Sequence, residues 1–113
     1  MPQWLSEILA RIRLLAAQGR VLFTHKAARE LYGLAVPLEQ EDAVELIAHL
    51  TPKESAGRVV STHTGEWLYV FKPRAGGLLL YLKIAVRSNC IVVSFHSDSD
   101  SEDEGDLDED QDD

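Results

Sequence analysis

The spacing of apolar residues changes once along this chain, near residue 55, and that change limits the possible folds more than any other feature. Before it, apolar residues recur every three or four positions, which is the period of an amphipathic helix. The clearest set is Leu5, Ile8, Leu9, Ile12 and Leu15. This pattern predicts helices over residues 3–18, 25–32 and from Pro37 to about Leu50, with a short extended piece at 21–23.

The residues at the expected helix ends support these boundaries. Thr24 can cap the second helix, and Gly33 is suited to ending it. Pro37 followed by carboxylates suits the start of the third helix, because negative charge is favoured at the positive N-terminal end. The dipeptide Thr51-Pro52 should then end that helix.

After residue 55 the apolar residues alternate with polar ones, which is the period of a strand. Strands are expected over residues 58–63, 66–72, 78–87 and 90–95. Thr64-Gly65, the segment 73–77 and the two-residue candidate Ser88-Asn89 can turn the chain between them. Helices followed by sequential strands predict an α+β domain, in which the N-terminal helices pack on one face of a small antiparallel sheet.

Charge divides the chain at about residue 97. Of the 19 Asp and Glu residues, 11 lie in residues 97–113, which contain no Lys or Arg. All 11 Lys and Arg residues and the other 8 acidic residues lie before that point, so a body of charge +3 precedes a tail of charge −11. The expected organisation is therefore one folded domain over residues 1–96 and a disordered acidic tail over 97–113.

Composition excludes several kinds of protein. The single cysteine, Cys90, allows no intrachain disulfide, and its apolar neighbours predict a packed thiol. No apolar run reaches the roughly 18–20 residues of a membrane span, and no signal-peptide pattern is present, so a cytoplasmic protein without membrane contact is expected. The four histidines fall in separate segments without ligand spacing, so neither a metal nor a cofactor is expected.

The strand expected at 78–87 has one apolar face and one face with polar residues. Tyr81, Lys83 and Arg87 share the second face, which could be either an open site for an anion or an ordinary solvated face. A hairpin at Ser88-Asn89 would bring His96 near Tyr81, where a histidine is suited to proton transfer.

Several segments resemble the MqsR (motility quorum-sensing regulator) toxin family within the RelE-like superfamily. They are residues 15–21 (LAAQGRV), 30–34 (ELYGL), 66–73 (EWLYVFKP), 80–84 (LYLKI) and 91–95 (IVVSF). The resemblance implies a helix-plus-sheet endoribonuclease that cuts mRNA without a metal. It also implies a toxin of a type II toxin–antitoxin system, held inactive by a cognate antitoxin protein.

The same resemblance suggests which residues would act on RNA. Tyr81 matches an active-site tyrosine, His96 occupies the place of a lysine, and Arg58 is the nearest cation to another expected lysine. These three are the expected catalytic residues. The expected substrate-binding residues are Lys72, Lys83 and Arg87.

Leu68 departs from the resemblance, because a functional glutamine is expected after Trp67. This departure favours an alternative, in which the fold serves as a non-catalytic module that binds protein or nucleic acid. An unrelated small binding protein is a third interpretation. The acidic tail is either a solubilising extension or a nucleic-acid mimic that contacts the basic face of its own chain and competes with RNA for Arg58, Lys83 and Arg87.

Overall fold

The computed structural model describes residues 2–98, so most of the tail expected to be disordered lies outside the described residues. Three helices precede most of the sheet: α1 (Gln3–Ala17), α2 (His25–Tyr32) and α3 (Gln40–Ala48). A 3₁₀ turn, η1 (Pro52–Glu54), leads into the strands. The strands are β1 (Val21–Phe23), β2 (Ser55–Val60), β3 (Trp67–Phe71), β4 (Arg74–Ala75), β5 (Leu78–Val86) and β6 (Cys90–Ser97).

The helix boundaries follow the capping residues closely. Thr24 accepts a hydrogen bond from the backbone N–H of Ala27 at 3.0 Å, so α2 has the expected N-cap and bounds. Helix α3 begins at Gln40 rather than at Pro37, because Glu39 and Asp42 form a reciprocal capping box at that point. Thr51 caps the following turn and so separates η1 from α3.

The sheet has the strand order β1-β6-β5-β3-β2, with β4 paired to β5 beside this path. Strands β2, β3, β5 and β6 form the expected antiparallel meander, but β1 joins β6 in parallel. The expected α+β fold with its antiparallel meander is confirmed, and the parallel pairing of β1, which the sequence did not predict, makes the sheet mixed. A three-residue strand far from its partner in sequence carries no local signal of its pairing direction, which the packing of the intervening chain decides.

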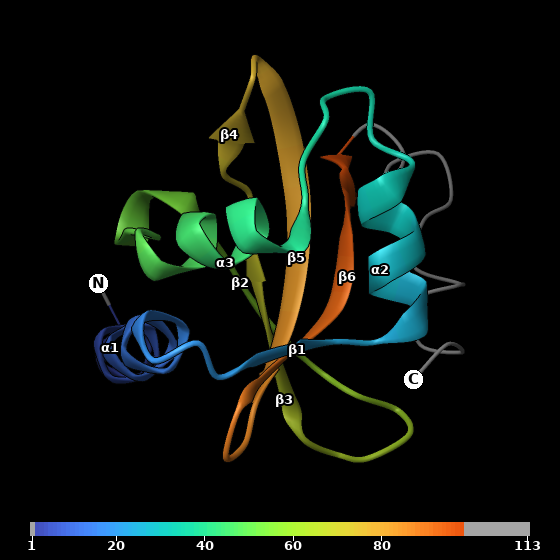
Figure 1. The fold of residues 1–113 in the computed structure, drawn as a ribbon. Helices are drawn as coiled ribbons and strands as arrows, with labels where there is room; N and C mark the ends of the chain where they lie inside the picture. The colour runs from blue at the N-terminus through green and yellow to red at the C-terminus, as the bar shows by residue number, and fades with distance from the viewer. Residues whose placement is uncertain (1, 99–113) are drawn as a thin grey trace.

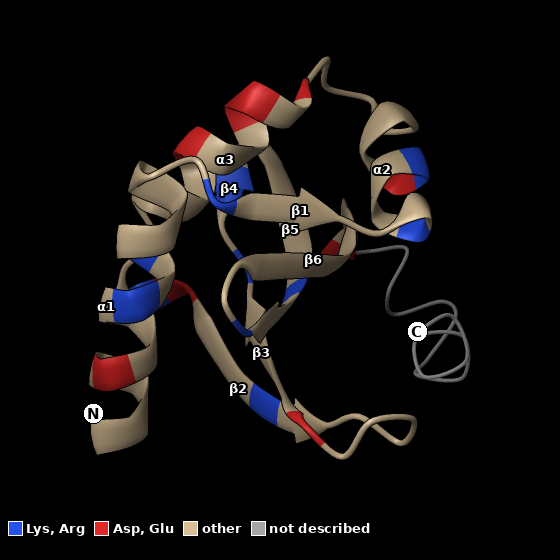
Figure 2. Ribbon diagram, turned by 60° about the horizontal axis from the view of Figure 1, so that its bottom comes forward, with Lys and Arg blue, Asp and Glu red and all other residues tan. Residues whose placement is uncertain are grey.

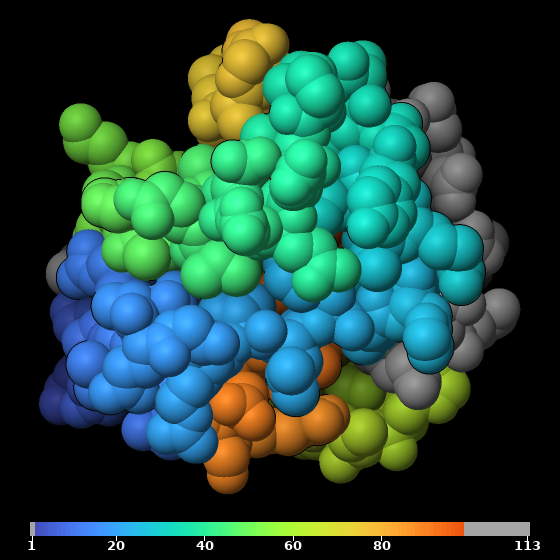
Figure 3. Space-filling view, in the orientation of Figure 1, coloured from blue at the N-terminus to red at the C-terminus, as the bar shows by residue number. Residues whose placement is uncertain are grey.

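Helices α1 and α3 cover one face of the sheet, and α2 lies beside β6 (Figure 1). Figure 3 shows the atoms of the helical half covering most of this side, with parts of the sheet visible at the top and bottom. The core between these layers contains Leu9 and Ile12 of α1, Ile47 of α3 and Leu82 and Phe95 of the sheet, all at most 1% exposed. None of the helices within residues 2–98 is long and apolar enough to cross a membrane.

Strand β2 spans Ser55–Val60 and ends earlier than expected, because Ser61 begins a turn. The Ser61 hydroxyl accepts hydrogen bonds from the backbone N–H groups of His63 and Thr64, both at 3.2 Å. A serine that bonds to the backbone two and three residues ahead favours a turn over a continued strand.

A β-bulge in β6 changes which residues face the core. Lys83 pairs with Ser94, whereas the next residue of β5, Ile84, pairs with Val92, so Val93 is the extra residue. Phe95 therefore joins Val92 in the main core, while Val93 lies in a smaller apolar cluster with Leu68 and Ala85. Simple alternation along the strand, which would place Phe95 on the same face as Val93, therefore fails past the bulge.

Candidate functional site

The sheet face that turns away from α1 and α3 carries a row of polar side chains. Tyr81 of β5 pairs with His96 of β6, and Lys72, which directly follows β3, lies on the same side of Tyr81. In the next row along the strands, Val70, Lys83 and Ser94 are paired. Cross-strand neighbours on one face of a sheet lie within contact range of each other. We call the set Lys72, Tyr81, Lys83, Ser94 and His96 the polar ladder.

Tyr81 and His96 form a stacked pair at the centre of the first row. Their ring centroids are 5.1 Å apart with an interplanar angle of 11°. The Nδ1 atom of His96 lies 2.8 Å from the carbonyl oxygen of Ser97. A carbonyl can only accept, so Nδ1 is the donor and the neutral imidazole keeps its lone pair on Nε2. The sequence prediction that the hairpin brings these two residues together is confirmed.

Lys72 adds a cation to this pair. Its Nζ atom lies 5.9 Å from the centroid of the Tyr81 ring and 3.2 Å from Oδ1 of Asp98. A lysine ammonium beside a phenol and an imidazole can hold a phosphate oxygen through charge and hydrogen bonding. Within the described structure, Lys72, Tyr81 and His96 thus form the part of the ladder best suited to an anion.

Lys83 lies on the same face but is only 1% exposed, and its cross-strand neighbour Ser94 is fully buried. The expectation that the whole face is open to solvent is therefore wrong at Lys83, and Tyr81 is itself only 9% exposed. The reason is the smaller apolar cluster, in which Leu68, Ala85 and Val93 pack on this face.

Leu68 belongs to the cluster just described, where it is 1% exposed. This is the position at which the resemblance implies a functional glutamine. The leucine fits its surroundings as a packing residue, and an aliphatic side chain can neither donate nor accept a hydrogen bond.

Sequence reasoning missed Lys26, which reaches the polar ladder from α2. Its side chain is 11% exposed and ion-paired with Glu30 at 3.1 Å. Its Nζ donates to the Ser94 hydroxyl at 2.8 Å and to the Val93 carbonyl at 3.3 Å. The i, i+4 spacing of Lys26 and Glu30 was visible in the sequence, but it suggests an ordinary surface pair until α2 is placed against β6.

Arg58 does not join Tyr81 and His96. It pairs with Tyr69, which in turn pairs with Ile84, so Arg58 lies on the face that carries the main core. Its guanidinium lies 4.4 Å from the Trp4 ring centroid and 3.8 Å from that of Trp67. A guanidinium between two indoles is held by cation–π attraction to both rings. Arg58 in this way links Trp4 of α1 to Trp67 of the sheet.

Arg87 is also distant from the stacked pair. It lies in the turn after β5, six residues from Tyr81, which corresponds to about 20 Å along a strand. Val86 pairs with Cys90, so the chain turns through three residues rather than through Ser88-Asn89 alone. The side chain donates to the Glu66 carboxylate at 2.6 and 3.1 Å, and this hydrogen bonding lowers the pKa of Glu66.

Two other features do not form a second reactive site. Cys90 is fully buried, and burial raises the pKa of its thiol to about 11, so it is neutral near pH 7. In the part of the chain that the structure describes, no group of three or more His, Cys, Asp or Glu side chains could hold a metal ion.

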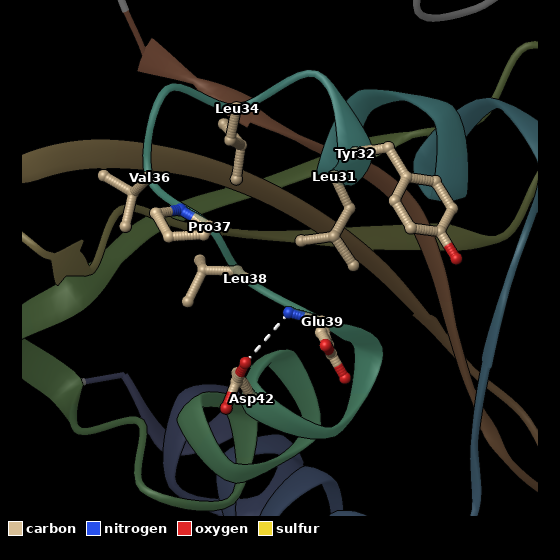
Figure 4. Close-up of a pocket in the computed structure, with 8 residues that line it drawn as sticks. All are labelled: Leu31, Tyr32, Leu34, Val36, Pro37, Leu38, Glu39 and Asp42. Carbon is tan, nitrogen blue, oxygen red and sulfur yellow. Dashed lines mark hydrogen bonds between the residues drawn. The ribbon is translucent and has the colours of Figure 1, made fainter.

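A hollow of about 360 Å³ lies between the end of α2 and the start of α3 (Figure 4). The residues that line it are Leu31, Tyr32, Leu34, Val36, Pro37, Leu38, Glu39 and Asp42. Its charged groups are acidic, as are the charged residues of α3 itself (Figure 2). The hollow is therefore unsuited to a polyanion, and the polar ladder remains the candidate site.

The fold and the ladder define a class of small α+β proteins in which neighbouring strands present Lys, Tyr and His side chains on the sheet face opposite the packed helices. Residues 6–97 match the model of the family described as motility quorum-sensing regulator, toxin of MqsA. This match covers most of the chain, so the protein belongs to the MqsR toxin family, whose members are toxins of toxin–antitoxin pairs. No curated protein matches the chain.

Proposed function

We propose that the chain is an endoribonuclease that cleaves mRNA with its own side chains and is held inactive by an antitoxin protein. The observation that carries this proposal is the stacked Tyr81–His96 pair with Lys72 beside it. Family membership supports the toxin role, and the geometry supports a site for phosphodiester chemistry.

The proposed reaction is attack of a ribose 2′-hydroxyl on the adjacent phosphorus. Nε2 of His96 takes the 2′-hydroxyl proton while the new O2′–P bond forms. The P–O5′ bond then breaks, and the leaving oxygen takes a proton from the Tyr81 hydroxyl. The ammonium of Lys72 stabilises the charge that develops on the phosphate, and buried Lys83 adds to the positive potential. The products are a 2′,3′-cyclic phosphate and a 5′-hydroxyl.

Cleavage of an end-labelled single-stranded RNA by the purified protein tests this function. We expect cleavage to persist in EDTA and the all-deoxy version of the same sequence to stay intact. Tyr81→Phe and His96→Ala should each lower the rate by roughly 10²-fold, as for loss of a positioned proton-transfer group. Tyr32→Phe and His63→Ala are matched controls, since both residues are exposed and lie outside the ladder.

Equal rates for the Tyr81 and His96 variants and for the wild type would remove both residues from the mechanism. A specific observation favours a second candidate, a non-catalytic binding module, because Leu68 is a packing residue where the resemblance implies a functional glutamine. RNA binding without cleavage by the wild-type protein would support that module over the nuclease.

A further inference from the structure

We propose that the acidic segment starting at Asp98 docks on the polar ladder of its own chain and competes there with RNA phosphate. The proposal rests on the function proposed above. Its first observation is that Asp98 is only 7% exposed and that its Oδ1 lies 3.2 Å from Nζ of Lys72. The carboxylate of Asp98, two residues after His96, thus contacts the Lys72 ammonium that the proposed mechanism assigns to the RNA phosphate.

The contact is suited to displacement. Asp98 Oδ1 forms the ion pair with Lys72 but makes no hydrogen bond within the described residues. A buried carboxylate oxygen without a hydrogen bond keeps part of its desolvation cost, so the net gain from the contact is small. A phosphate that brought further hydrogen bonds could therefore replace the carboxylate.

Charge and chain length favour the rest of the acidic segment, residues 99–113, as the occupant of the polar ladder. Residues 99–113 contain ten acidic residues and no basic ones. The face they would meet holds Lys72, Lys83 and Lys26, with Lys72 the most exposed of the three at its side chain. A flexible chain of 15 residues would reach roughly 20 Å, comparable with the extents of the molecule, 32 × 29 × 25 Å.

Tethering makes even a weak contact effective. A segment attached next to its binding site has a local concentration on the order of millimolar. An extension that served only to keep the protein soluble would not require its first carboxylate, Asp98, to be buried against Lys72. The expected regulation is electrostatic, so salt should weaken it.

The test uses full-length protein and a fluorescent single-stranded RNA with 2′-O-methyl groups, which cannot be cleaved. In the neutral-tail variant, all Asp and Glu of residues 98–113 become Asn and Gln. We expect this variant to bind the RNA roughly tenfold tighter than wild type at about 50 mM salt, and less than about twofold tighter at about 500 mM. Asp98→Asn should raise the affinity for the RNA more than the matched control Asp113→Asn does.

Equal affinity of wild type and the neutral-tail variant at low salt would overturn the competition. NMR separates this outcome from failure of the proposed function. If neither protein binds RNA, the RNase proposal fails, and docking is judged on the amide shifts of Lys72, Tyr81 and His96. Changes at these residues on tail neutralisation would uphold docking, and unchanged shifts would overturn it.

Discussion

At the residue scale, the two arginines expected at the RNA site act in structural contacts instead. Arg58 lies between Trp4 and Trp67, and Arg87 binds the Glu66 carboxylate with two nitrogens. Both contacts use the flat guanidinium, which stacks on aromatic rings and pairs with carboxylates better than an ammonium does. Lys72 and Lys83, by contrast, belong to the polar ladder, and Lys26 contacts it through Ser94.

The Glu66–Arg87 pair gives a prediction about pH. The pKa of Glu66 is lowered from 4.5 chiefly by the hydrogen bond from Arg87. A lowered folded-state pKa contributes stability that is fully present above 4.5 and is lost as the pH falls through the folded value. Because Arg87 is about half exposed, Glu66→Gln should lower the free energy of unfolding at neutral pH by only about 0.5–1 kcal/mol.

Urea denaturation across the acid range measures this effect. The difference between Glu66→Gln and wild type should shrink as the pH falls below 4.5. Glu7→Gln is the control, because Glu7 accepts a hydrogen bond from uncharged Gln3 on an exposed surface of α1. A Glu66 variant that matches this control at neutral pH would contradict the prediction.

At the scale of elements, α2 holds the part of β6 that extends beyond β1. The pairing of β1 with β6 ends at Val92, and from there Glu30 and Lys26 of α2 bind the strand. Oε1 of Glu30 accepts a hydrogen bond from the backbone N–H of Phe95 at 2.8 Å, and Phe95 directly precedes His96. The helix thereby replaces a neighbouring strand and fixes the direction of β6 past its bulge.

Replacing Glu30 by Ala should therefore destabilise the fold. The change leaves the Phe95 N–H and the Lys26 ammonium without this carboxylate, which costs about 1–3 kcal/mol in the free energy of unfolding. Hydrogen exchange at the Phe95 amide should also become faster than in wild type. Glu30→Gln, which keeps an acceptor, should lose less stability.

Glu45→Ala is the matched control for Glu30→Ala, since Glu45 is an exposed glutamate on α3 that contacts His49. It should change stability by no more than about 0.5 kcal/mol. Unaltered exchange at Phe95 in Glu30→Ala would show that α2 does not hold β6 in solution.

At the scale of the whole molecule, charge is segregated by position. Residues 1–96 carry +3 and residues 97–113 carry −11, and Asp98 at the junction already contacts Lys72. The overall charge of −8 is therefore the sum of a mildly basic body and a strongly acidic C-terminal segment.

Inducing the full-length protein in a bacterium tests the function at this scale. We expect growth to slow and transcripts to shorten, and His96→Ala to restore both. The neutral-tail variant should be more toxic at equal expression, because the competing carboxylates are gone. Normal growth with intact transcripts for both wild-type and neutral-tail proteins would contradict the toxin role.

The sequence alone predicted the three helices, the extended piece at 21–23 and the four strands of the meander in their order, but it gave only a turn where β4 forms and did not predict η1. Apolar periodicity and the capping residue Thr24 gave α2 its bounds, and alternation gave the four strands of the meander, because both signals are local. The proximity of His96 to Tyr81 also followed from sequence, since a hairpin brings neighbouring strands side by side, whereas their direct pairing is a matter of register that only the structure shows.

Only the tertiary structure decided which residues share the site. The bulge at Val93, the parallel pairing of β1, the burial of Lys83 and the approach of Lys26 depend on contacts between segments far apart in sequence. Such contacts leave no periodic signal in either segment alone. For the same reason, the family resemblance suggested Arg58 as a site residue, whereas the register of β2 places it on the opposite face of the sheet.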